Sequence, residues 1–236
     1  MKDQRPAKDK IIIPLDVSNR HAADHLIEQL IGHAAWFKVG LQLFCSAGPS
    51  VARDIKSIGA KLFLDLKLHD IPNTVEHAAE AVSELKADFL TVHLLGGITM
   101  SAAAKKGLAG TSTQVLGVTV LTSHDQQSLN EIGLVDELTS QVLRLASVAD
   151  SAGLDGLVAS PLEIAPLRDR FGSRFTLVIP GIRPAWSVSD DQKRTLSPSA
   201  ALAAGADYLI IGRPITAASV PAEAFQRIVA ELEAGE

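Results

Sequence analysis

The chain is poor in cysteine, has no long apolar run and shows no concentration of charge of one sign. Its single cysteine, Cys45, excludes an internal disulfide framework and suits a reducing cytoplasm. We expect Cys45 to be a small buried hydrophobe. No apolar stretch approaches the ~20 residues that cross a bilayer. Residues 11–13, followed closely by Asp16, are too short for the apolar region of a signal peptide. These absences predict a cytoplasmic protein.

Acidic and basic residues are scattered along the chain. The 27 Asp and Glu and 22 Lys and Arg give a formal net charge of -5, without a basic stripe or an acidic tail. The sequence therefore gives no sign of a nucleic-acid partner. With 236 residues, 47% of them hydrophobic, the chain can form one large α/β domain. Residues 1–10, which are rich in charge and contain a proline, predict a disordered tail before a domain over 11–236.

Short runs rich in β-branched residues alternate with segments of helical apolar spacing. The predicted strands cover residues 11–15, 36–39, 61–68, 89–94, 114–121, 156–159, 176–179 and 208–211. The predicted helices cover residues 21–31, 49–57, 75–86, 101–108, 139–152, 199–204 and 222–232. This alternation predicts a single-domain α/β fold, the (β/α)8 TIM barrel. An open doubly wound sheet is the alternative, but it seldom needs eight strands in so short a chain.

Polar residues gather at the ends of the predicted strands, whereas the strand bodies are apolar. Active sites of this barrel lie at the C-terminal ends of the strands. Those ends carry Asp16, Lys38, Asp65 with Lys67, His93, Thr122 with Ser123, Ser160, Pro180 with Gly181, and Gly212 with Arg213. The sequence therefore predicts an active site at this end of the barrel.

The predicted strand over 61–68 carries charges that a purely structural strand would not hold. Side chains alternate along a strand, so Asp65 and Lys67 share one face while Leu64, Leu66 and Leu68 share the other. An apolar core accepts a carboxylate and an ammonium only when they are paired or used. This stretch indicates a charge network built for chemistry.

Asp16 and Lys38 lie at neighbouring strand ends and extend this pattern. A lone Lys38 could extend to solvent, but beside Asp16, Asp65 and Lys67 it predicts an alternating Asp/Lys network that fixes a catalytic proton donor. Asp70 lies three residues past Lys67 and can point away from its own barrel. The segment over residues 71–76 predicts the start of a helix.

In that helix start, Asn73 can cap the first turn and Glu76 occupies the third helical position, as in a capping box. Capping explains Asn73 fully and Thr74 partly. It does not explain Asp70, which therefore stays a candidate functional residue.

Two strand ends carry a glycine close to an arginine. Gly181 with Arg183 follows the seventh predicted strand, and Gly212 with Arg213 follows the eighth. Glycine lets backbone N–H groups approach a phosphate, and arginine binds it bidentately. The loops after these two strands hold phosphate in many such barrels. Ordinary turn chemistry is the alternative explanation.

A long polar loop over residues 183–199 is typical of a lid. Gln192 within it could donate to a bound ligand, although such a residue alone is more often simply exposed. Asp16, Asp65 and His93 could imitate a metal site. The nearby lysines would repel a metal, and no HxH or HExxH spacing occurs. We expect His93 to be a hydrogen-bonded barrel residue and expect no metal site.

The chain resembles the bacterial form of the orotidine 5'-phosphate decarboxylase family over about residues 11–232. The most specific match is the sequence DLKLHDIPNT at residues 65–74. Shorter matches occur in order: PLD at 14–16, FKVG at 37–40, VLTS at 120–123, PGIR at 180–183 and IGRP at 211–214.

The resemblance implies decarboxylation of orotidine 5'-phosphate to UMP by a homodimeric barrel without metal or organic cofactor. It implies that Lys67 is the proton donor and that Asp65 lies near the substrate carboxylate. Asp16 and Lys38 would contact the ribose and support the network. Asp70 and Thr74 would reach the partner's site. The remaining implied contacts are Thr122, Ser123 and Pro180 at the pyrimidine, and Arg183, Gln192, Gly212 and Arg213 at the phosphate.

Two other functions are alternatives to this one. Related barrels for 3-keto-gulonate-phosphate decarboxylation and hexulose-phosphate synthesis share an Asp-x-Lys-x-x-Asp core but use Mg²⁺ and sugar phosphates. Residues 69–74 favour the nucleotide enzyme. A barrel that only binds phosphate should have lost at least one of Asp65, Lys67 or Asp70, and all three are present.

Overall fold

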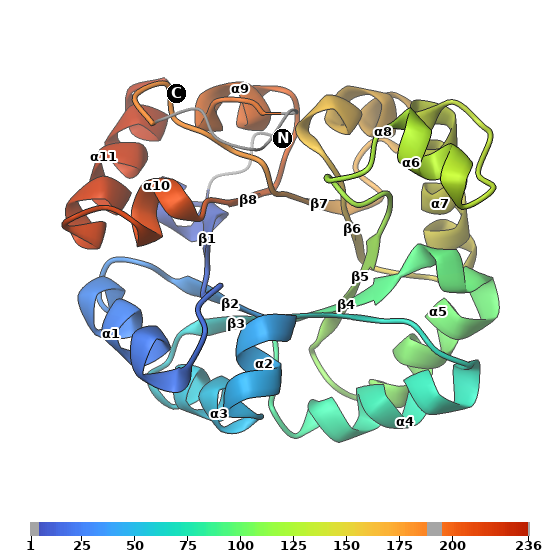
Figure 1. Cartoon of the computed structure of the whole chain (residues 1–236), viewed down its shortest axis with the longest axis horizontal. Helices are drawn as coiled ribbons and strands as arrows, with labels where there is room; N and C mark the ends of the chain where they lie inside the picture. Colours follow the sequence, from blue (N-terminus) through green and yellow to red (C-terminus); the bar gives the residue numbers. More distant parts are fainter. Residues whose placement is uncertain (1–4, 188–194, 236) are drawn as a thin grey trace.

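Eight parallel strands close into a ring in the computed structural model, which describes residues 5–187 and 195–235 (Figure 1). Each strand pairs with its sequence neighbours, and β8 pairs with β1. The strands are β1 (Ile11–Pro14), β2 (Trp36–Gly40), β3 (Lys61–Leu68), β4 (Phe89–His93), β5 (Gln114–Val118), β6 (Gly156–Val158), β7 (Thr176–Ile179) and β8 (Tyr208–Ile210). The predicted (β/α)8 barrel is confirmed.

Helices surround the ring on its outside (Figure 1). They are α1 (Arg20–Leu30), α2 (Leu41–Ala47), α3 (Ser50–Ser57), α4 (Pro72–Ser83), α5 (Gly97–Gly107), α6 (Gln126–Glu131), α7 (Leu138–Ser151), α8 (Ile164–Phe171), α9 (Pro198–Ala203), α10 (Arg213–Thr216) and α11 (Pro221–Ala234). Short 3-10 turns are η1 (Ala7–Lys10), η2 (Leu94–Gly96) and η3 (Pro161–Glu163). The sequence did not predict α2, α6, α8 or α10. None of these four exceeds eight residues, too short for a clear helical period.

The core has two layers that follow the alternation of side chains along each strand. One cluster fills the barrel interior and includes Ile12, Trp36, Phe63 and Phe89. The other lies between the strands and the helices. Successive residues of a strand point to opposite sides of the sheet. Residues two positions after those of the interior aromatic layer therefore also face the barrel axis.

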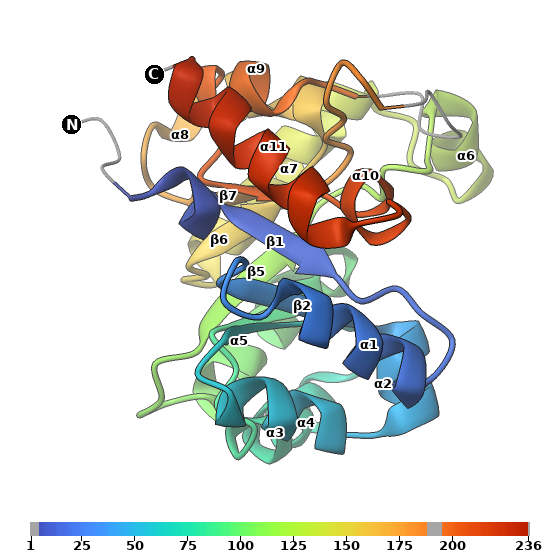
Figure 2. The same ribbon diagram turned by 90° about the vertical axis from the view of Figure 1, so that its left-hand side faces the viewer.

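The two ends of the barrel differ. In Figure 2, α2, α6 and α10 lie toward the end where the strand arrows point, whereas η1 lies at the opposite end. At that opposite end Arg5 lies 4.2 Å from the centre of the Tyr208 ring and donates to the carbonyl of Asp207 at 3.0 Å. Ala7 and Lys10 are buried. Residues 5–10 therefore do not form the disordered tail expected over residues 1–10, because they pack against this end of the barrel.

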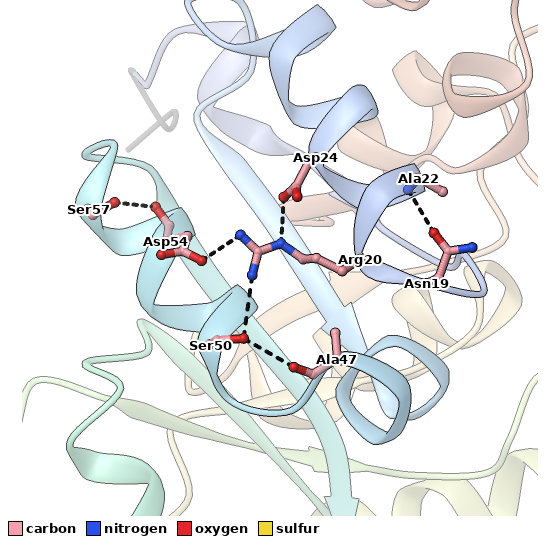
Figure 3. Close-up of polar contacts among 8 residues, drawn as sticks. All are labelled: Asn19, Arg20, Ala22, Asp24, Ala47, Ser50, Asp54 and Ser57. Carbon is pink, nitrogen blue, oxygen red and sulfur yellow. Dashed lines mark hydrogen bonds and ion pairs between the residues drawn. The ribbon is translucent and has the colours of Figure 1, made fainter.

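A polar contact between the first and third helices secures the outer layer near the start of the chain (Figure 3). Asn19 caps α1 by accepting from the backbone N–H of Ala22. Arg20 donates to Asp24 and to Asp54 of α3, both at 2.6 Å. These groups are partly exposed, so each pair contributes at most about 1 kcal/mol.

Two local expectations are wrong. Cys45 is exposed on α2 and not buried, because this short helix buries only Leu43. The residue that precedes α4 is Ile71, without a side-chain cap, so Asn73 lies within the helix. Pro72 begins this helix instead, and Glu76 pairs with Lys106 at 2.7 Å. No described helix is long and apolar enough to cross a membrane.

Candidate active site

A cavity of about 330 Å³ opens at the C-terminal ends of the strands. Its volume lies in the range of small-molecule sites. Residues from seven of the eight strands or the loops after them line it: Pro14, Asp16, Lys38, Asp65, Lys67, Val118, Val120, Leu121, Thr122, Val158, Ala159, Pro180, Gly181, Arg183, Ile210, Gly212, Arg213 and Thr216. The lining combines the charged residues at the ends of β1, β2 and β3, apolar residues of β5 and β6, and the two arginines that follow β7 and β8.

The alternation along the strands explains which residues reach the cavity. Trp36 faces the barrel interior, so Lys38, two positions later, faces the axis as well. The same step leads from Phe63 to Asp65. Residues closer to the strand starts form the aromatic layer, and residues closer to the strand ends line the cavity floor.

Four charges alternate along the cavity floor. Lys38 Nζ lies 3.1 Å from Asp16 Oδ1 and 3.2 Å from Asp65 Oδ2. Lys67 Nζ lies 2.8 Å from Asp65 Oδ1. The side chains of Lys38 and Asp65 are 8% and 10% exposed, whereas that of Asp16 is 59% exposed. Asp65 therefore lies between two ammonium groups in a largely dry environment.

The pKa values of the two buried members favour their charged forms. Burial alone would lower the pKa of Lys38, but the charges of Asp65 and Asp16 and their hydrogen bonds raise it above its ordinary value. Burial likewise opposes ionisation of Asp65, yet Lys38 and Lys67 hold the pKa of this carboxyl below its usual range. Each charge is thus kept by its neighbours.

The backbone at Lys67 departs from a regular strand. Its φ is 48°, in the left-handed region that costs a non-glycine residue about 1–3 kcal/mol. Between Leu64 and Leu68, four residue steps of β3 match two steps of β4, from Leu90 to Val92. Lys67 shares the cavity with Asp65, as predicted, but an irregular backbone and not simple alternation brings it there.

Buried Thr91 of β4 supports this irregular turn. The Lys67 N–H donates to Thr91 Oγ1 at 2.9 Å, and the Thr91 hydroxyl donates to Asp65 Oδ1 at 3.0 Å. Thr91 was not among the predicted site residues. Counting by twos from Phe89 places it on the interior face, and this step could have identified it.

The predicted phosphate-binding residues lie in the loops after β7 and β8. Gly181, Arg183, Gly212 and Arg213 line the cavity together. Gly181 has φ +78°, which favours glycine. At Gly212 an added Cβ would lie 3.1 Å from the Cγ of Pro14, so a side chain there would crowd the cavity wall.

Several predicted residues do not line the cavity of their own chain. Asp70 and Thr74 are exposed, and Asp70 Oδ1 accepts from the N–H of Ile71 at 2.6 Å. Ser123 is exposed beyond Thr122. Ser160 is buried, and its N–H donates to the carboxylate of Glu163 in η3. Gln192 lies outside the described residues.

His93 ends β4 beside two other histidines. Its ring stacks on His69 at a centroid distance of 5.5 Å. Burial, followed by the influence of His69, Lys67 and His124, lowers the pKa of His93 to about 4. His93 Nδ1 accepts from the N–H of Leu95 at 3.3 Å, so it is a neutral, hydrogen-bonded barrel residue at neutral pH.

Comparisons with known proteins identify the family of this chain. The profile of the family described as "Orotidine 5'-phosphate decarboxylase / HUMPS family" matches residues 9–228. A protein from Moorella thermoacetica named orotidine 5'-phosphate decarboxylase is 47% identical over 235 residues, which cover 96% of this chain and 93% of that protein. A protein of the same name from Nitrosococcus oceani is 47% identical over 227 residues, which cover 95% and 98%.

A solved structure gives the same result in three dimensions. The crystal structure of orotidine 5'-phosphate decarboxylase from Lactobacillus acidophilus superposes with a TM-score of 0.84 and 39% sequence identity. The match covers 95% of this chain and 99% of that chain. The profile match and the full-length relatives lead to one conclusion: this chain belongs to the orotidine 5'-phosphate decarboxylase / HUMPS family.

Proposed function

We propose that this chain decarboxylates orotidine 5'-phosphate to UMP, the last step of de novo UMP synthesis, and that it does so in the cytoplasm without a cofactor. The observation that carries the proposal is the row of alternating charges formed by Asp16, Lys38, Asp65 and Lys67 on the cavity floor. Relatives of nearly full length that bear the decarboxylase name support it.

The cavity suggests how the nucleotide binds. Its phosphate would lie near Arg183 and Arg213, where bidentate binding is available. The pyrimidine would lie beside Thr122 and Pro180, with its carboxylate toward Asp65. Asp16 and Lys38 would contact the ribose. Binding energy at the phosphate, far from the reacting carbon, can then help to reach the transition state.

The charge network supplies the chemistry. The bond between C6 of the pyrimidine and its carboxylate breaks, CO₂ leaves, and the electron pair stays on C6. The anionic Asp65 disfavours the neighbouring substrate carboxylate, whereas the Lys67 ammonium stabilises the developing carbanion and then protonates it. UMP forms, and the neutral lysine takes a proton from solvent. Fixed charges need no reorganisation during this step.

The donor set favours this reaction over the Mg²⁺-dependent sugar-phosphate alternative. Asp16 and Asp65 are each paired with a lysine within 3.2 Å, and the positive charge of these lysines opposes binding of a cation at the same carboxylates. We therefore expect turnover of orotidine 5'-phosphate to be unchanged after exhaustive EDTA treatment. The measurement is the loss of substrate absorbance. Activity that EDTA removes and Mg²⁺ restores would contradict the cofactor-free mechanism.

Replacement of Arg213 should affect only substrates that carry a phosphate. Arg213→Ala should lower kcat/KM for orotidine 5'-phosphate by roughly tenfold or more, because an ionic hydrogen-bonded contact contributes about 1.5–3 kcal/mol. With orotidine, which lacks the phosphate, the variant should match the wild type. An equal loss on both substrates would mean that Arg213 acts structurally.

We also propose that the active unit is a dimer with shared sites. Leu41, Ile71, Leu95 and Ile98 follow the neighbouring strands β2, β3 and β4 at the cavity end, and they are 42–66% exposed. Exposed apolar side chains gathered in one region are typical of an interface. Asp70 lies next to Ile71 and outside its own cavity, so pairing of this face with a second copy could bring Asp70 into the partner's site.

A further inference from the structure

Among the buried polar groups near the cavity, Thr91 has a distinct pair of contacts. Its hydroxyl oxygen accepts from the Lys67 backbone N–H at 2.9 Å, and its proton goes to Asp65 Oδ1 at 3.0 Å. Lys67 Nζ donates to that same carboxylate oxygen at 2.8 Å. One hydroxyl thus joins the main chain of Lys67 to the carboxylate that pairs with its side chain.

The backbone here needs such support. Lys67 has a left-handed φ of 48°, and the regular β3–β4 ladder is interrupted between Leu64 and Leu68. A strained residue persists only where its surroundings hold it in place. Thr91 is fully buried, so water cannot replace its hydroxyl as the partner of the Lys67 N–H.

We propose that Thr91 is a positioning residue, whose hydroxyl holds the Lys67 backbone in its left-handed conformation and orients Asp65, so that the Lys67 ammonium points at the reacting carbon. Thr91 does not line the cavity and acts through these two residues. The inference rests on the proposed role of Lys67 as proton donor. It adds that a residue of the neighbouring strand, β4, fixes the position of the proposed donor.

The test compares three variants. Thr91→Val keeps the shape and removes the hydroxyl, whereas Thr91→Ser keeps the hydroxyl. Thr113→Val is the matched control, because Thr113 is also buried and its hydroxyl donates to a backbone carbonyl, that of Ala87 at 2.7 Å. Thr113 directly precedes β5, at the start of the strand and away from the cavity.

Thr91→Val should lower kcat by about 10- to 100-fold, the cost of displacing a reacting group by about 1 Å. The KM for orotidine 5'-phosphate and the Kd for UMP should stay within about threefold, since the binding groups are untouched. Thr91→Ser should restore kcat to within about threefold of the wild type, and Thr113→Val should keep it. Unchanged kcat in Thr91→Val, or an equal loss in Thr91→Ser, would overturn the proposal.

A crystal structure of Thr91→Val provides a readout that does not depend on turnover. Lys67 should leave the left-handed region, or its Nζ should move away from Asp65. A structure with both features unchanged would also overturn the proposal. If the wild type failed to decarboxylate orotidine 5'-phosphate, the proposed function would fail, while this structural comparison would still decide whether Thr91 holds Lys67.

Discussion

Lys67→Ala should reduce kcat for orotidine 5'-phosphate by more than about 10²–10⁴-fold, the range that general acid catalysis alone supplies. The variant removes the proposed proton donor and also one of the two cations beside Asp65, because Lys67 Nζ lies 2.8 Å from the carboxylate of Asp65. Loss of charge stabilisation should therefore add to the loss of proton transfer. Steady-state turnover measures the effect, and thermal unfolding verifies that the variant is folded.

The same strand offers a matched control. Lys61, at the start of β3, pairs with Asp88 at 2.8 Å. Lys67, near the end of β3, pairs with Asp65 in the same way. Lys61→Ala removes one Lys–Asp pair at the opposite end of the barrel, where residues act on stability. Turnover of this control should be close to that of the wild type. If Lys67→Ala stayed within about tenfold of the wild type, below the range for general acid catalysis, Lys67 would not be the acid.

The alternation of short β-branched runs with segments of helical spacing explains why the barrel could be predicted from the sequence. Residues 176–179 form a continuous apolar run, which length and β-branched content, and not periodicity, assign to a strand. The polar residues at the strand ends could be found without any knowledge of tertiary contacts. Asp65 was identifiable because a carboxylate in an apolar strand is costly unless it is paired. This argument needs only the sequence and the cost of burying a charge.

Other features depend on contacts that the sequence does not display. Counting along β4 places Thr91 on the interior face, but the role that we propose for it follows only from its distance to Lys67 and Asp65. The left-handed backbone at Lys67 lies where the register between β3 and β4 shifts. Residues 5–10 pack against the barrel, where Arg5 contacts Tyr208 and Asp207, far away in the chain. Long-range packing overrides local composition in each case.

Mixing two inactive variants should restore activity if sites are shared between subunits. Lys67 lines its own cavity, whereas Asp70 lies outside it and beside exposed Ile71. Lys67→Ala and Asp70→Asn should each be nearly inactive alone, because each removes one group from every site. In a mixed dimer both lesions fall in one site, and the other site carries neither.

With random pairing at equal amounts, roughly half of the dimers are mixed, so about a quarter of all sites should regain full activity. Activity should return at the rate of subunit exchange, which mass spectrometry follows independently. Lys67→Ala mixed with Asp65→Asn is the matched control, since both residues line the same chain's cavity and every site of the mixed dimer keeps one lesion. Exchange that proceeds without any return of activity in the Asp70→Asn mixture would show that Asp70 acts within its own chain, and the shared-site dimer would be wrong.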